Sequence, residues 1–115
     1  MTTFSLLITT SPLASQNFAS ALQFCNAALI SGYQIEQIFL YQDAVLAAAA
    51  DIDLPADEPN LGQQLAILCQ QNHIPLLYCV TAAEKRGMLD PGSNFIGAGL
   101  AEFAMRLTNS KLVQF

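Results

Sequence analysis

Residues 76–87 read LLYCVTAAEKRG, and this stretch decides the fold that the rest of the chain has to complete. Its first half is apolar almost throughout, which predicts a short buried strand over residues 74–80. Its second half predicts a helix over residues 81–87, in which Thr81 is the N-cap and Glu84, three residues later, completes a capping box. A buried strand that runs directly into a helix is typical of a parallel α/β sheet.

Cys79 lies where the predicted strand ends and the predicted helix begins. In open α/β sheets this edge carries ligands and catalytic groups. Unpaired backbone N–H groups and the positive end of the helix stabilise a thiolate there. At the other end of the predicted helix, Lys85 and Arg86 lie in the last turn, where cations are favoured, and Gly87 ends the helix. We therefore expect Cys79 to be a reactive sulfur carrier. The competing interpretation is a small buried hydrophobic residue at the end of a strand.

Composition limits the classes of protein to consider. At 115 residues the chain is long enough for one domain, residues 1–115, with one hydrophobic core. Charged residues make up only 11% of the sequence and hydrophobic residues 53%. A fully buried parallel sheet and a large apolar interface with partner subunits would each explain this balance. The net charge is −5 with four basic residues, so we expect no direct binding to nucleic acid.

The three cysteines, Cys25, Cys69 and Cys79, form no CxxC pair, and the chain has one histidine, so we expect no metal site. Cys25 and Cys69 lie in apolar helical patterns, which favours a core position for both. His73 would begin the strand that Cys79 ends, so a Cys/His hydrolase lacks support. The N-terminus has no basic region and no apolar run reaches roughly 18 residues, which predicts a cytoplasmic protein without a membrane span.

The rest of the chain alternates between strand and helix patterns. Strands are expected over residues 4–9, 34–41 and 111–115, and helices over residues 15–31, 43–50, 61–72 and 95–107. Ser15 and Asn94 are the expected N-caps of the first and last helices, and the expected end of the first is Gly32. Residues 51–60 contain two prolines and four acids and should form a surface loop. Together these patterns predict a three-layer α/β/α fold with a mostly parallel sheet of four to five strands.

Other residues at the same edge of the predicted sheet have weaker interpretations. The turn over residues 9–15 contains no glycine, which argues against a phosphate-binding loop. Its hydroxyl groups would line the Cys79 site if the two strands were neighbours. Asp43, after the second strand, has no assigned role. Five aromatic residues fit a subunit interface as well as they fit the core, namely Phe39, Tyr41, Phe95, Phe103 and Phe115.

Four stretches resemble one known family when they are taken together. They are ASALQF at residues 19–24, IFLYQDAV at 38–45, CVTAAEKRG at 79–87 and LVQF at 112–115. Their combination and order are similar to those of the TusD/DsrE family of sulfur-relay proteins. The resemblance implies a DsrE-like fold and a sulfurtransferase that accepts sulfane sulfur as a persulfide on Cys79. It would pass that sulfur to a partner thiol without a cofactor.

The resemblance also implies partners. TusB-like and TusC-like subunits would assemble with this chain, a TusA-like protein would donate sulfur, and a TusE-like protein would accept it for 2-thiolation of the tRNA wobble uridine. A chain that acts alone would form homo-oligomers instead. Three alternatives stay open: a DsrE-type carrier in sulfur oxidation, a non-catalytic structural subunit, and a small-ligand-binding flavodoxin-like domain. The segment between Gly87 and Phe95 is shorter than in family members, which affects the shape of the site and the docking of partners.

Overall fold

The fold is built on one parallel sheet of five strands in the order β4-β3-β2-β1-β5. Every neighbouring pair of strands is parallel, which confirms the predicted type of sheet and its upper strand number. The computed structural model describes residues 2–11, 16–49, 60–88, 91–92 and 94–115. The strands are β1 (Thr3–Ile8), β2 (Gln34–Leu40), β3 (Leu76–Cys79), β4 (Ile96–Ala98) and β5 (Lys111–Gln114).

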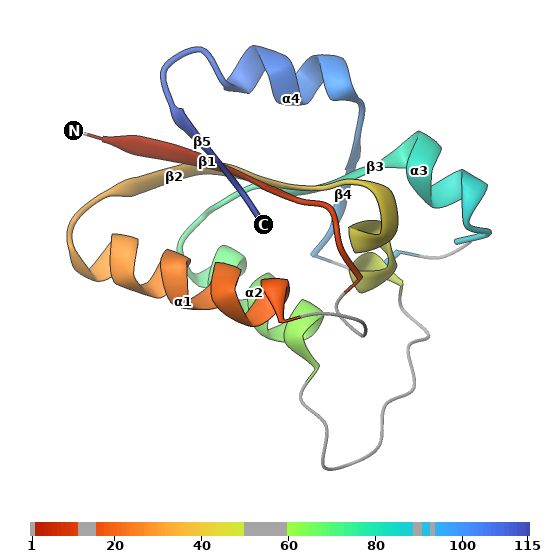
Figure 1. Ribbon diagram of the computed structural model, residues 1–115, viewed down its shortest axis with the longest axis horizontal. Coiled ribbons are helices and arrows are strands. Elements are labelled where there is room, and N and C mark those ends of the chain that lie inside the picture. Colours follow the sequence, from red (N-terminus) through yellow and green to blue (C-terminus); the bar gives the residue numbers. More distant parts are fainter. Residues whose placement is uncertain (1, 12–15, 50–59, 89–90, 93) are drawn as a thin grey trace.

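Helices lie on both faces of this sheet and complete the predicted three layers (Figure 1). Helices α1 (Asn17–Ile30) and α2 (Leu61–Gln71) cover one face, and α4 (Leu100–Arg106) covers the other. The 3-10 helix η1 (Gln42–Ala48) follows β2, and α3 (Val80–Lys85) follows β3. Within the described ranges, no helix combines the length and the apolar character that a membrane span requires.

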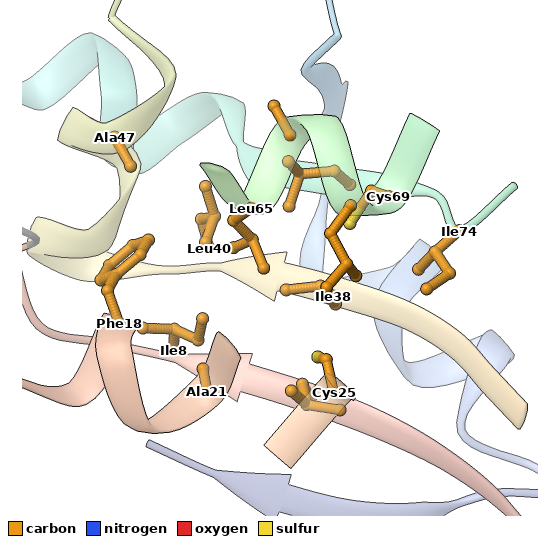
Figure 2. Close-up of a cluster of buried hydrophobic side chains, with 14 of the residues drawn as sticks. Ile8, Phe18, Ala21, Cys25, Ile38, Leu40, Ala47, Leu65, Cys69 and Ile74 are labelled. Atoms are coloured by element: carbon orange, nitrogen blue, oxygen red, sulfur yellow. The ribbon is translucent and has the colours of Figure 1, made fainter. Parts of the chain in front are cut away.

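The strands pack apolar side chains on both of their faces. Ile38 and Leu40 belong to the layer beneath α1 and α2, which Figure 2 shows in part. Phe39, between them in the sequence, and Leu77 belong to the opposite layer. Successive side chains of a strand point to opposite faces, so a strand covered on both sides needs consecutive apolar residues. This requirement explains the unbroken apolar runs that made the strands recognisable.

The end of α1 follows the prediction. Gly32 has a φ of 87°, a left-handed conformation that glycine adopts without a steric cost. The N–H of Tyr33 then donates to the carbonyl oxygen of Ala28 at 2.9 Å and closes the helix. At the other end, the predicted N-cap Ser15 lies outside the described residues, and Gln16 occupies the position before the first helical residue.

The predicted helix over residues 95–107 is wrong in its first part. Residues 96–98 form the edge strand β4, in which Ala98 pairs with Cys79, and α4 begins at Leu100 with Gly99 rather than Asn94 as its N-cap. The helical pattern of this segment is outweighed by pairing with β3. Gly97 leaves room for the start of α3, because a Cβ atom there would lie 3.0 Å from Val80 Cγ2.

A bulge in β2 adapts this strand to α4. The register against β1 shifts between Phe4 and Ser5, so that Glu36 is an extra residue in β2. As a result, Glu36 and Gln37 both interact with α4 although they are consecutive in the sequence. Arg106 Nη1 of α4 lies 3.8 Å from Glu36 Oε1, and Gln37 is fully buried against the same helix.

The buried amide of Gln37 ties three parts of the chain together. Its Nε2 atom donates to Ser5 Oγ at 3.2 Å and to the carbonyl oxygen of Phe103 at 3.1 Å. Ser5 Oγ in turn lies 2.7 Å from Ser110 Oγ, just before β5. Gln37 Oε1 has no hydrogen-bond partner among the described residues, so the two bonds of Nε2 are what join this buried amide to Ser5 and to α4.

The five aromatic residues that fitted both core and interface take part in packing within the chain. Phe39 and Phe103 are buried, and their rings stack with centroids 4.8 Å apart. Tyr41, Phe95 and Phe115 are half-buried and pack against the two core clusters. The aromatic content therefore needs no interface to explain it.

Phe103 is the main apolar anchor of α4, and its removal should destabilise the fold. We expect Phe103→Ala to lower the free energy of unfolding by about 3–5 kcal/mol, because it leaves a cavity beneath α4. Met105 on the same helix is 77% exposed, and Met105→Ala should change stability by no more than about 0.5 kcal/mol. Urea unfolding followed by circular dichroism measures both, and equal effects would contradict the assigned role of Phe103.

Candidate active site

Cys79 is held at the carboxyl end of an interior strand. It is the last residue of β3 and pairs with Ala98 of β4. Leu76 and Leu77, which precede it in β3, are about 1% exposed. The backbone at Cys79 is therefore fixed by pairing and packing, and its side chain lies at the edge of the sheet where ligands bind in open α/β folds.

The start of α3 differs from the prediction. The helix begins at Val80, so Cys79 itself is the N-cap, and its side chain makes no capping hydrogen bond. Thr81 is already inside the first turn, and the expected capping box between Thr81 and Glu84 does not form. Cys79 is the last residue of β3 that pairs with β4, so the extended backbone ends one residue earlier than the predicted strand over residues 74–80. The predicted helix end is confirmed, since Gly87 has a φ of 70°.

A pocket of about 490 Å³ opens beside Cys79. Cys79 is only 4% exposed, yet it lines this pocket, so its thiol is recessed but not sealed inside the core. The other lining residues come from the exit of β2, from α3 and from the start of α4. They include Tyr41, Gln42, Thr81, Lys85, Arg86 and Leu100.

The two remaining cysteines lie in the core, as predicted. Cys25 on α1 is fully buried and Cys69 on α2 is 2% exposed, both within the apolar cluster between the helices and the sheet (Figure 2). Burial raises the pKa of each thiol to about 12, and the neighbouring Cys25 adds to the effect at Cys69. Both are therefore neutral thiols at physiological pH and poor nucleophiles.

Asp43, which had no role in the sequence interpretation, pairs with a residue of the pocket. Its Oδ1 atom accepts a hydrogen bond from Arg86 Nε at 2.9 Å, and Arg86 Nη1 donates to the carbonyl oxygen of Ala82 at 3.0 Å. The ion pair links η1 to the end of α3. The side chain of Arg86 is 28% exposed and that of Asp43 is 64% exposed, so this ion pair adds little to the stability of the fold.

Gln42 has a strained backbone beside the pocket. Its φ of 52° is uncommon for a residue other than glycine, and such conformations cost about 1–3 kcal/mol. Neither this strain nor the Asp43–Arg86 pair has a specific signature in the sequence, and the only available signal was the position of residues 42 and 43 directly after a strand.

Two expectations about neighbours of Cys79 have different outcomes. β1 and β3 are not neighbours, because β2 lies between them, and Thr9, Thr10 and Ser11 do not line the pocket. Residues 12–15 of that turn lie outside the described part. His73 lines another hollow together with Gln34 and Ile35 at the start of β2. It therefore lies at the opposite end of β3 from Cys79, which agrees with the absence of a predicted Cys/His pair.

A second pocket, of about 460 Å³, lies at the other edge of the sheet. Thr3, Glu36, Arg106 and Ser110 line it, and no cysteine does. Within the part of the chain that the structure describes, no three histidine, cysteine or acidic side chains gather in a way that could hold a metal ion. The pocket beside Cys79 is therefore the better candidate for chemistry at a sulfur atom.

Comparison with known proteins places this geometry in a family. The sequence profile of the DsrE/DsrF-like family matches residues 3–115. A Pectobacterium carotovorum protein named sulfurtransferase TusD is 32% identical, and the match covers 100% of both chains. A TusD homologue of Pasteurella multocida is 37% identical over 72% of this chain and 75% of its own. A protein of Allochromatium vinosum that carries the name DsrE is 35% identical over 77% of this chain and 68% of its own.

The crystal structure of the ychN protein from E. coli matches 100% of both chains with a TM-score of 0.84 at 23% identity, which shows that the fold is shared. The architecture is thus that of a DsrE-like α/β protein. The chain belongs to the DsrE/DsrF-like family, and the TusD relatives above are named sulfurtransferases. The alignment with the P. carotovorum protein spans 129 residues against the 115 of this chain, so the relative contains residues without a counterpart here.

The contrast among the three cysteines predicts selective modification. A small thiol reagent such as methyl methanethiosulfonate should modify the native protein once, at Cys79, because Cys79 lines a pocket whereas Cys25 and Cys69 lie inside the core. Cys79→Ser should not react in the native state, and both proteins should gain two further modifications after unfolding in urea. Intact mass measures the number of groups added, and a native Cys79→Ser protein that reacts would contradict the assignment.

The raised pKa values of the buried thiols predict a loss of stability in alkali. An unfolded cysteine ionises near its ordinary pKa of 9.0, while folded Cys25 holds its proton up to about 12. Between these values the unfolded state binds fewer protons, so the stabilising contribution, complete below the unfolded pKa, is lost as the pH rises.

Cys25→Ala removes one titrating group. The free energy of unfolding should then fall less steeply with pH in this window, by up to about 1.4 kcal/mol per pH unit. Urea titrations across the window compare the two proteins, and tyrosine ionisation affects both equally. Parallel curves would contradict the raised pKa of Cys25.

Proposed function

We propose that this chain is the persulfide-carrying subunit of a sulfur relay and that Cys79 holds the transferred sulfur. The observation that carries the proposal is the contrast among the thiols: Cys25 and Cys69 are enclosed in the core, whereas Cys79 lines a pocket at the carboxyl edge of the sheet. The sulfurtransferase names of the relatives support a sulfur-transfer role.

Transfer at this site is an exchange between sulfur atoms. The Cys79 thiolate attacks the terminal sulfur of a donor persulfide, and a new S–S bond forms as the donor's S–S bond breaks. The donor leaves as a thiolate, and Cys79 becomes a persulfide. An acceptor thiolate then attacks the terminal sulfur on Cys79, which returns to a thiolate. Each step conserves charge and oxidation level, so neither requires a cofactor.

The recessed position of Cys79 suits a carrier. A persulfide has to survive until the correct acceptor arrives, and a thiol that is 4% exposed offers little surface to thiols in solution. The pocket of about 490 Å³ gives a partner segment room to bring its own sulfur close. The same burial defines the second candidate function, a non-catalytic structural subunit in which Cys79 only fills space.

We propose the cytoplasm, where thiols stay reduced, as the site of this relay and the 2-thiolation of the tRNA wobble uridine as its destination. The match with a TusD protein over the whole chain supports this route over sulfur oxidation by a DsrE-type carrier. TusB-like and TusC-like subunits would be the structural partners, with TusA-like and TusE-like proteins as sulfur donor and acceptor. Exposed Ile96, Leu100 and Met105 support an oligomer, because they leave apolar surface on and beside α4.

Sulfur loading separates the carrier from the structural subunit. After incubation with a low-molecular-weight persulfide donor, the wild type should gain one sulfur atom that a reducing agent removes. Cys25→Ala should gain the same atom, whereas Cys79→Ser should gain none. Intact mass followed by peptide mapping measures the gain and its location. A wild type that stays unmodified, or a Cys79→Ser protein that still gains sulfur, would exclude Cys79 as the carrier.

A further inference from the structure

The pocket beside Cys79 is cationic on a protein that is acidic overall. The chain carries four basic residues and a net charge of −5, and two of the four, Lys85 and Arg86, line this pocket. The other two lie towards the opposite edge of the sheet, where Arg106 lines the second pocket and Lys111 begins β5. The local charge near Cys79 is thus opposite to that of the whole molecule, which favours anions at this position.

Arg86 is oriented by two contacts. Its Nη1 atom donates to the carbonyl oxygen of Ala82 within α3, which fixes the guanidinium group against the helix. Its Nε atom binds the carboxylate of Asp43, which comes from η1. Asp43 is 64% exposed and can turn into solvent, so replacing it by another carboxylate costs little free energy. Lys85 forms no ion pair with any residue that the structure describes.

The turn that carries Asp43 has a strained backbone beside the pocket. Gln42 lines the pocket with a φ of 52°, and Asp43 follows it directly. Strained conformations of this kind cluster at ligand sites and switch regions. At this turn, the strained residue lies between the end of β2 and the carboxylate that reaches Arg86.

We propose that Arg86 and Lys85 form a carboxylate-binding site beside Cys79, which Asp43 occupies in the free protein. The partner that exchanges sulfur with Cys79 carries a carboxylate close to its own cysteine, and this carboxylate displaces Asp43 from Arg86. The inference rests on the proposed function, because it assigns the recognition of the reacting partner to the same pocket. Arginine suits this role, since its guanidinium group binds carboxylates in a fixed geometry.

Three persulfide peptides provide the test. The first has Glu beside its cysteine and an amidated chain end, the second has Gln at that position and an amidated end, and the third has Gln and a free terminal carboxylate. The initial rate of sulfur gain at Cys79 is followed by intact mass. The wild type should load about twofold to fivefold faster from a carboxylate-bearing peptide than from the neutral one. The first and third peptides show whether a side chain or a chain end supplies the carboxylate.

Three variants identify the residues responsible. Arg86→Gln should reduce the rate ratio between charged and neutral peptides towards one, and Asp43→Asn should increase it because the internal competitor is gone. Lys111→Gln removes the same charge at a distant position and should keep the wild-type ratio. The ratio in the wild type should also fall as salt is added.

The outcomes separate this inference from the function beneath it. Equal rates from all three peptides in the wild type, or a ratio that Arg86→Gln or Asp43→Asn leaves unchanged, would overturn the carboxylate site while sulfur loading of Cys79 stands. A Lys111→Gln protein that loses the preference would overturn it as well, since a general charge effect would then explain the rates. Absence of sulfur on Cys79 from every peptide would overturn both proposals.

Discussion

The structure depends on covering a parallel sheet on both faces. Apolar side chains alternate between the layer beneath α1 and α2 and the layer beneath α4, and the buried Ser5 and Gln37 are the polar exceptions among the described residues of the interior strands. Burial of this kind supplies most of the favourable free energy of a small domain and gives a strand one definite register. For β3, this packing also determines where the strand ends. A strand held on both faces ends at a fixed point, and that point is Cys79.

The three thiols show how position sets chemistry when the side chain is the same. Cys25 and Cys69 point into the layer between helices and sheet, where desolvation keeps their protons in place. Cys79 belongs to the opposite layer but lies at its border, so that one side contacts the core and the other lines a pocket. This border position combines limited exposure with a pocket, which are the two properties that the proposed carrier role of Cys79 requires.

Much of the fold follows from the sequence because the relevant signals are local. Consecutive apolar residues mark β1, β2 and β3, and Gly32 and Gly87 mark helix ends that need a positive φ. The position of Cys79 at a strand end was predictable for the same reason.

The predictions from the sequence failed where contacts between distant parts of the chain determine the conformation. The segment after Asn94 has a helical sequence pattern but forms the strand β4, because it pairs with β3. The Asp43–Arg86 pair joins residues 43 positions apart, and the strain at Gln42 has no sequence signature. Likewise, β2 pairs with both β1 and β3, so these two strands are not neighbours as one interpretation of the turn after β1 required.

The bulge at Glu36 has a consequence for the phase of β2. Ile35 and Ile38 are an odd number of positions apart and yet pack into the same layer, so the extra residue shifts the phase of the strand by half a pleat. The amino-terminal part of β2 therefore faces the two layers in the opposite phase from the part that leads to Tyr41. The bulge lies near the start of β2, whereas Cys79 lies at the carboxyl end of β3, so the change of phase occurs at the end of the sheet remote from the thiol.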